Sequence, residues 1–209
     1  APAYLPGSEI RIFDFFPPPQ LDVLDRLAMV VILHLPRPGR LKDPVNLAQL
    51  LEIENRWPNI KLVVAHVGRA YCNEDVGNAF DVLAGSQRMN FDISANTNDE
   101  VFQLLIEAVG PRRVLFGSDL PILRMRMRRI CRDGRYVNLV PPGLYGDVSA
   151  DPNMEEVDTQ QAEKLTFFLY EEIAALARAA ARTGLTTEDV KDIFYNNAHT
   201  LLELPEEIQ

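Results

Sequence analysis

The stretch WPNIKLVVAHVGR, residues 57–69, decides the fold class of this sequence. Its stretch at 60–65 is apolar except for Lys61 and predicts a strand, which His66 follows directly. The run MVVIL at 29–33 is continuous and apolar, and it also ends at a histidine, His34. A run of this kind is typical of a strand inside a parallel sheet, where both faces of the strand are covered. The two stretches therefore predict strands that each end in a chemically useful side chain.

Strands and helices alternate on both sides of these stretches. The apolar patterns predict strands at residues 10–16, 29–33, 60–65, 88–93 and 113–116. Helices are expected at residues 20–28, 43–56, 75–83, 99–109, 163–182 and 187–202. The segment 122–159 is rich in arginine, glycine and proline, and we expect it to be irregular apart from a helix over 124–131. This order predicts a single α/β domain over residues 1–209, with parallel strands joined by right-handed crossovers.

Composition and charge limit the partners and the compartment. The 209 residues are 47% hydrophobic and 24% charged, as expected for a globular protein, and a net charge of −9 argues against nucleic acid as a general partner. The sequence contains no apolar run long enough to span a membrane and no signal-peptide pattern at its start, so we expect a cytoplasmic location and no membrane partner. Cys72 and Cys131 form no CxxC pair, so neither a zinc knuckle nor a disulfide framework can be identified, and reduced thiols are expected.

Polar side chains follow the predicted strands at equivalent places. His34 and His66 each end a strand, and Ser118 and Asp119 end another. In parallel α/β folds, ligands bind at the carboxyl ends of the strands. Histidine is a metal ligand or a general base, and an aspartate can bind a divalent metal or take a proton from a metal-bound water. The alternative is structural: each histidine could bond to a carbonyl group, and Asp119 could cap a helix. The recurrence at one edge of one sheet favours a site.

Five runs of the sequence resemble the amidohydrolase superfamily. They are residues 31–34, 57–69, 90–94, 110–121 and 195–202. They are most similar to its amidohydrolase-related branch, which includes aminocarboxymuconate-semialdehyde and resorcylate-type decarboxylases. The resemblance implies a TIM-type (β/α)8 barrel with one or two divalent metal ions, Zn²⁺ first and Mn²⁺ second.

The resemblance also implies roles for individual residues. His34 would end strand 5 of the barrel as a metal ligand. His66 would end strand 6 as a ligand or the catalytic histidine, and Asp119 would end strand 8, where it binds the metal and handles the proton. Ser118 and Arg69 would face the substrate. The third histidine, His199, lies in the terminal motif and is expected to be structural.

One part of the family pattern is missing from this sequence. The strand 1 metal motif, HxH or a variant with glutamate, has no counterpart among its three histidines. Counting back from Asp119 makes the strand at 10–16 number 4, so we expect an incomplete barrel of about strands 4 to 8. The chain is then either the carboxyl-terminal part of a longer protein or a short homologue. An open sheet would expose apolar faces and favour a homo-oligomer, and without the strand 1 ligands we expect metal binding to be weak.

Three functions remain open from the sequence. In a hydrolase, metal-bound hydroxide would attack a small amide, ester or lactone while Asp119 moves the proton. In a decarboxylase, the metal and arginine would hold a carboxylated ring while His66 and Asp119 protonate carbon. A non-catalytic fragment that self-associates is the third. Six arginines follow Asp119. One or two of them could clamp a substrate carboxylate, but we expect most of them to form a solvated face that pairs with the acidic chain itself. They are Arg124, Arg126, Arg128, Arg129, Arg132 and Arg135.

Overall fold

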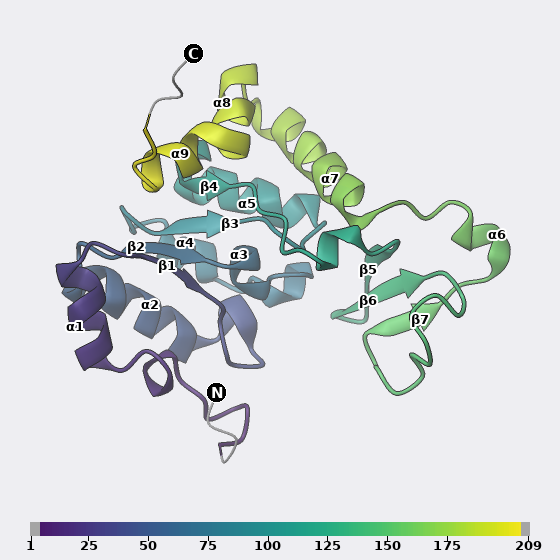
Figure 1. The fold of residues 1–209 in the computed structure, drawn as a ribbon, viewed down its shortest axis with the longest axis horizontal. Helices are drawn as coiled ribbons and strands as arrows, with labels where there is room; N and C mark the ends of the chain where they lie inside the picture. Colours follow the sequence, from purple (N-terminus) through teal and green to yellow (C-terminus); the bar gives the residue numbers. More distant parts are fainter. Residues whose placement is uncertain (1–4, 206–209) are drawn as a thin grey trace.

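The centre of the molecule is a parallel sheet of four strands flanked by helices (Figure 1). The computed structural model describes residues 5–205, so residues 1–4 and 206–209 of the predicted domain lie outside the described part. The strands lie side by side in chain order: β1 (Val30–Leu33), β2 (Lys61–Val64), β3 (Asn90–Asp92) and β4 (Val114–Leu115). The predicted alternation and the parallel direction of these strands are confirmed. Their carboxyl ends therefore meet at one edge of the sheet.

Helices connect the strands and continue beyond the last one. Before β4 the chain forms α1 (Pro18–Arg26), α2 (Pro44–Arg56), α3 (His66–Arg69), α4 (Ala79–Leu83) and α5 (Asp99–Val109). After it come α6 (Thr159–Ala162), α7 (Phe168–Thr183), α8 (Thr187–Lys191) and α9 (Asn197–Leu201). Helix α2 begins where the sequence predicts, because the Asp43 carboxylate accepts hydrogen bonds from the backbone of Val45 and Asn46. In the described part of the chain, none of these helices is long and apolar enough to cross a membrane.

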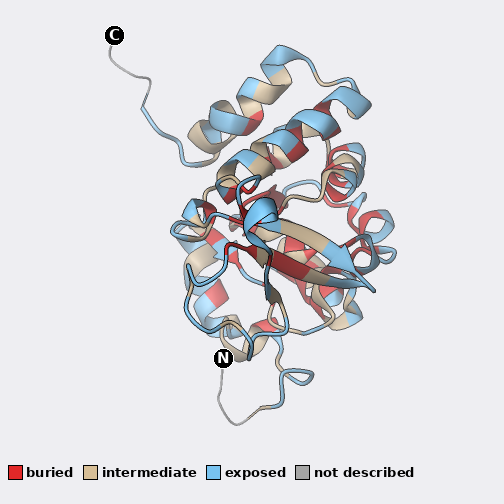
Figure 2. Ribbon diagram, turned by 90° about the vertical axis from the view of Figure 1, so that its right-hand side faces the viewer, coloured by how far each residue is buried: buried red, intermediate tan, exposed pale blue. Residues whose placement is uncertain are grey.

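The main core lies between one face of the sheet and the helices that connect its strands. Figure 2 shows buried residues gathered at the centre, with the outer sides of the helices exposed. The largest buried side chains in this core include Leu33, Leu50, Ile53, Phe91 and Phe102. Helix α5 also packs along α7, which extends the helical layer past β4 (Figure 1).

The other face of β1 is open, which corrects the prediction that residues 29–33 are buried on both faces. Val31 and Leu33 are buried, whereas Ile32 between them is 68% exposed. Alternate strand residues point to opposite faces, so the helices cover only one of them. The open face leads to the cavity described below.

Residues 10–16 are not a strand, so this prediction was wrong. Residues Ile12–Asp14 form a short 3-10 helix. The Asp14 carboxylate accepts hydrogen bonds from the backbone N–H and the guanidinium of Arg11, which closes a local turn instead of leaving the chain extended. Ile12 is fully buried, and its N–H donates to Gln49 of α2 at 2.8 Å. The parallel sheet therefore has four strands where the sequence predicts five.

The segment 122–159 carries a second sheet, which corrects the expected helix over 124–131. Strands β5 (Arg128–Arg132) and β6 (Arg135–Val140) are antiparallel, and β7 (Met154–Glu156) runs parallel to β6. Asp133 and Gly134 join β5 to β6 with φ of 53° and 71°. An Asp-Gly pair with both φ values positive is a strong hairpin signal. The many arginines of this segment indicated an exposed helix or loop instead.

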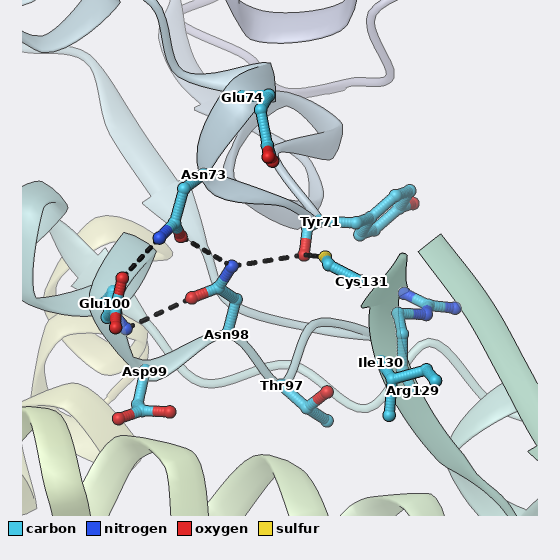
Figure 3. Close-up of a pocket in the computed structure, with 10 residues that line it drawn as sticks. All are labelled: Tyr71, Asn73, Glu74, Thr97, Asn98, Asp99, Glu100, Arg129, Ile130 and Cys131. Carbon is cyan, nitrogen blue, oxygen red and sulfur yellow. Dashed lines mark hydrogen bonds between the residues drawn. The ribbon is translucent and has the colours of Figure 1, made fainter. Parts of the chain in front are cut away.

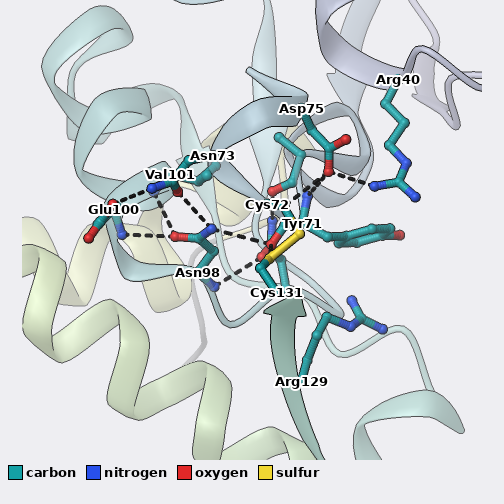
Figure 4. Close-up of a disulfide and its surroundings, with 12 residues drawn as sticks. Arg40, Tyr71, Cys72, Asn73, Asp75, Asn98, Glu100, Val101, Arg129 and Cys131 are labelled. Carbon is teal, nitrogen blue, oxygen red and sulfur yellow. Dashed lines mark hydrogen bonds and ion pairs between the residues drawn. A yellow bond between two sulfur atoms is a disulfide. The ribbon is translucent and has the colours of Figure 1, made fainter. Parts of the chain in front are cut away.

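A disulfide links the second sheet to the loop after α3. Cys72 follows α3, and its sulfur bonds to that of Cys131 on β5, 59 positions later (Figure 4). The expectation of two reduced cysteines is therefore wrong for this structure. Spacing in the sequence does not encode the contact, because it depends on the hairpin that places β5 beside the loop of Cys72.

Candidate functional site

A cavity of about 420 Å³ lies at the carboxyl ends of the parallel strands and extends along their open face. Its polar lining consists of His34, His66, Asp92, Ser94, Ser118 and Asp119. Its apolar lining comes from the open face of the sheet and from α9: Val30, Ile32, Val63, Ala65, Leu115, Phe116, Ala198, Leu201 and Leu202. Four predicted site residues, at 34, 66, 118 and 119, are thus brought together by the fold.

His66 is held in one orientation by the turn after β3. Its Nδ1 lies 3.0 Å from the carbonyl oxygen of Ser94 and 2.9 Å from the Ser94 hydroxyl. A carbonyl oxygen only accepts, so we assign the proton of the neutral ring to Nδ1. The lone pair of the neutral ring is then on Nε2, available for a proton or a metal ion. The same arrangement is common among metal-binding histidines, whose other nitrogen donates to a fixed acceptor.

Asp92 organises this contact from the end of β3. Its Oδ1 accepts from the His66 backbone N–H at 3.0 Å and from the Ser94 hydroxyl at 2.5 Å. It also accepts from the Ser94 backbone N–H at 3.1 Å. Asp92 was not predicted as a site residue, although its place two residues before Ser94 at a strand end was a usable signal.

The backbone after His66 is strained. All four residues of α3 have positive φ, from 50° at Val67 to 64° at Arg69, so this turn is left-handed. Such a conformation costs roughly 1–2 kcal/mol for each non-glycine residue. Gly68 is required at φ 62°, because a Cβ there would lie 2.6 Å from Leu41 Cδ1. Strain of this kind concentrates at functional sites, where surrounding contacts hold it.

His34 follows β1, the strand next to β2, and its ring lies beside that of His66. The two ring centroids are 5.5 Å apart and nearly perpendicular. Burial lowers the pKa of His34, and the charges of Arg69 and His66 lower it further. A lowered pKa keeps the imidazole neutral near pH 7, which is the form that binds metal ions.

Two other predicted residues lie outside this cavity. Arg69 does not line it: its Nη1 donates to the carbonyl oxygen of Leu35 at 3.1 Å, so its link to the site is through its charge on His34. His199 lies on α9 with its Nε2 3.2 Å from the carbonyl oxygen of Pro205. That contact agrees with the structural role expected for His199.

The donor chemistry and the donor geometry disagree about a metal ion. Two imidazoles and a carboxylate are the donor set of many catalytic zinc sites. Within residues 5–205, however, no three histidine, cysteine, aspartate or glutamate side chains gather closely enough to hold an ion. The residues as placed therefore do not form a closed metal centre, and we derive no reaction step through a metal.

Two partly or fully buried charged side chains near the cavity were missed by the sequence analysis. Glu172 of α7 is fully buried, and burial raises its pKa to about 9. The backbone amides of Ala95 and Asn96 face it and oppose this rise, but neither carboxylate oxygen has a partner at hydrogen-bond geometry. Burial also lowers the pKa of Arg129 on β5. Glu172 lies in an amphipathic helix pattern and Arg129 in an arginine-rich run. Neither pattern predicts that the side chain points inward.

The other arginines partly follow the solvated-face prediction. Arg128 and Arg132 are exposed and pair with Glu171 and Glu155 of the same chain. Arg126 instead donates to the carbonyl oxygens of Ala162, the last residue of α6, and Leu165.

A second cavity of about 300 Å³ lies beside the disulfide (Figure 3). It is lined by Tyr71, Asn73, Glu74, Thr97, Asn98, Asp99, Glu100, Arg129, Ile130 and Cys131. Asn73 and Asn98 bond to each other and tie this rim to the start of α5. None of the residues predicted for the site lines this cavity.

Comparisons with known proteins give a family and a fold. The family model described as "Amidohydrolase" matches residues 10–204. A zinc-bound amidohydrolase from Burkholderia multivorans is 15% identical with a TM-score of 0.56, and the match covers 90% of this chain and 57% of that one. A 4-oxalomesaconate hydratase from Rhodopseudomonas palustris is 16% identical with a TM-score of 0.51, covering 92% of this chain and 51% of that one.

A third solved structure is of the same kind. A probable 2-pyrone-4,6-dicarboxylic acid hydrolase from Acinetobacter baumannii is 16% identical with a TM-score of 0.51, covering 89% of this chain and 57% of that one. At these identities the likeness shows the fold alone. The chain spans between 51% and 57% of the length of these three proteins. No curated protein matches it.

Proposed function

Because the chain belongs to the amidohydrolase family over residues 10–204, we propose that its larger cavity is the active site of a metal-dependent, amidohydrolase-like enzyme. The observation that supports this most is the meeting of His34, His66 and Asp119 around one cavity at the carboxyl ends of parallel strands. The substrate we propose is a small carbonyl or carboxylate compound, hydrolysed at an amide, ester or lactone bond. A cavity of about 420 Å³ suits a ligand of that size.

Each residue of the site has a proposed role that follows from the groups around it. His66 presents the lone pair of Nε2, since Ser94 holds its Nδ1. Asp119 is the proposed proton carrier between the attacking and leaving groups. Ser118 lines the cavity and is the proposed polar contact to the substrate. Arg69 keeps its proposed substrate-binding role through its positive charge beside His34.

The divalent metal belongs to this proposal as well. Zn²⁺ is our first choice and Mn²⁺ the second, with His34, His66 and Asp119 as the candidate ligands. Such an ion would supply a nucleophilic hydroxide at neutral pH. Bringing the three side chains around one ion requires them to lie closer together than they do here.

We further propose that the four parallel strands correspond to strands 5–8 of a TIM-type barrel, and that the chain forms a homo-oligomer. The open face of β1 supports the homo-oligomer, because exposed apolar strand surface favours a covering partner. The cytoplasmic location also stays a prediction. Disulfides are rare in that compartment, so a thiol titration of Cys72 and Cys131 in freshly isolated protein tests it.

A non-catalytic role is the second candidate function. The open sheet face and the lack of a gathered three-donor group among residues 5–205 favour it. The decarboxylase alternative stays a prediction from the resemblance.

The test is a hydrolysis assay on a panel of small esters, lactones and amides, with Zn²⁺ or Mn²⁺ added. We expect Asp119→Asn and His66→Gln to lower the rate by at least about 100-fold, because each removes a proton-handling group. His199→Gln is the matched control and should keep the wild-type rate. Equal turnover in all four proteins would contradict this assignment of the active site, and no turnover of any substrate would favour the non-catalytic role.

A further inference from the structure

The hairpin of the second sheet places one arginine side chain against the turn that follows β3. Arg129 projects from β5, and its guanidinium carbon lies 4.4 Å from the ring centre of Tyr71 and 4.7 Å from that of Tyr136. A third ring, that of Phe168 on α7, lies 4.9 Å away. Figure 4 shows this guanidinium beside Tyr71, next to the disulfide of Cys131. Three aromatic faces hold a cation more firmly than a solvated surface does.

The hydrogen bonds of Arg129 fix the orientation of its guanidinium group. Its Nε donates to the side-chain oxygen of Asn138 on β6 at 2.8 Å, which orients the planar group. Its Nη1 donates to the carbonyl oxygen of Ala95. The structure gives Arg129 no carboxylate partner among the described residues, unlike its neighbour Arg128. The guanidinium group of Arg129 therefore binds a backbone carbonyl oxygen where Arg128 binds a carboxylate.

The carbonyl that Arg129 holds belongs to the turn that orients His66. Ser94 precedes Ala95, and its carbonyl and hydroxyl oxygens both lie at hydrogen-bond distance from His66 Nδ1. Ala95 has φ of 49°, a left-handed conformation that an alanine rarely adopts. A turn of this kind persists when contacts from outside fix it. Glu172 of α7 faces the amides of Ala95 and Asn96 in the same turn.

We propose that Arg129 is a positioning residue for His66. By holding the Ala95 carbonyl, it keeps Ser94 where Ser94 accepts a hydrogen bond from Nδ1 of His66. The chain of contacts runs from β5 through the turn after β3 to the imidazole. The effect on the ring stands independently of catalysis, whereas its value for turnover rests on the proposed function.

A purely structural role for Arg129 makes a different prediction. If the side chain only packs the hairpin against Tyr71, replacing it would lower stability and leave the state of His66 unchanged. Arg129→Met keeps an apolar side chain of similar length and removes every donor. Arg129→Lys keeps the charge and loses the planar fork. Arg128→Gln, one residue away on the exposed side of β5, is the matched control.

The experiment is two-bond ¹H–¹⁵N NMR of the histidine rings in the full chain, without substrate. The signals of His66 are assigned from the spectrum of His66→Gln. In the wild type and in Arg128→Gln we expect the neutral ring to carry its proton on Nδ1. In Arg129→Met we expect that tautomer to lose its dominance, with a partial effect in Arg129→Lys.

The outcomes separate this proposal from the proposed function. An unchanged His66 tautomer in folded Arg129→Met would overturn the positioning role, even if the protein is an active enzyme. If Arg129→Met does not fold, Asn138→Ala is used, because it removes the contact that orients the guanidinium. A change at His66 in either variant, with the His34 and His199 signals in place, supports the proposal even if no substrate is turned over. In an active enzyme, a displacement of about 1 Å at such a site lowers the rate by up to roughly 100-fold, so kcat should fall while KM changes little.

Discussion

Glu172 should make the stability of this fold depend on pH. Its carboxyl group is fully buried on α7, and burial raises its pKa to about 9 from an ordinary value of 4.5. Between these two values the folded protein holds one more proton at this residue than the unfolded chain does. The stabilisation from the neutral carboxyl is therefore complete below about pH 4.5, and it is lost as the pH rises toward about 9.

The size of the effect follows from the same pKa values. Each pH unit within the window costs the folded state up to about 1.4 kcal/mol. Between pH 5 and pH 7, Glu172 should lower the free energy of unfolding by roughly 2–3 kcal/mol. Glu172→Gln keeps the size of the side chain and removes the ionisation, so the variant should not show this loss.

The assay is urea unfolding of the wild type and Glu172→Gln at pH 5, 6, 7 and 8. Glu163→Gln serves as the control, because Glu163 is exposed. We expect the stability difference between Glu172→Gln and the wild type to grow by roughly 2–3 kcal/mol from pH 5 to pH 7. The control should run parallel to the wild type at every pH. Parallel curves for Glu172→Gln as well would refute the reasoning, because they would mean that the residue ionises equally in both states.

Three further predictions concern the disulfide, the strained turn and the open face of the sheet. Cys131→Ser opens a link that spans 59 positions, which should lower the free energy of unfolding by about 2–4 kcal/mol; equal urea midpoints for this variant and for oxidised wild type would contradict a formed disulfide. Gly68→Ala places a Cβ 2.6 Å from a Leu41 methyl at φ 62° and should cost roughly 1–3 kcal/mol in thermal unfolding, whereas a gain in stability would show that the turn is not left-handed. Ile32→Ser changes a side chain that is 68% exposed, so it should alter stability by less than about 0.5 kcal/mol and weaken self-association in sedimentation experiments; a monomeric wild type would contradict the proposed homo-oligomer.

The central sheet could be predicted because its signals are local. Apolar runs bounded by helix starts at Asp43 and Asn98 locate the strands and the helices between them. The meeting of His34, His66 and Asp119 was also predictable, since parallel strands present their carboxyl ends at one edge. These features depend on period and order along the chain.

The features that the sequence did not reveal depend on contacts between distant segments. Residues 10–16 have strand-forming composition, but the bond from Ile12 to Gln49 and the turn at Asp14 fix a 3-10 helix. The inward position of Arg129 depends on rings from three other elements. The role of Asp92 depends on a turn that brings Ser94 back toward His66.

The hairpin at Asp133 is different, because the sequence itself contains the signal for its turn. An Asp-Gly pair between two short stretches that contain β-branched residues predicts a two-residue turn. The density of arginine in that segment favoured an exposed helix or loop instead. Charge alone therefore misled the interpretation of residues 124–131.

The most direct test of the proposed metal-dependent site is equilibrium dialysis of the chelator-treated protein against Zn²⁺. We predict binding of one ion per chain. We also predict that His34→Ala and Asp119→Ala weaken it by at least about 10-fold, and that His199→Ala binds as the wild type does. Absence of stoichiometric Zn²⁺ or Mn²⁺ binding, or equal binding in all four proteins, would contradict a metal site formed by His34, His66 and Asp119.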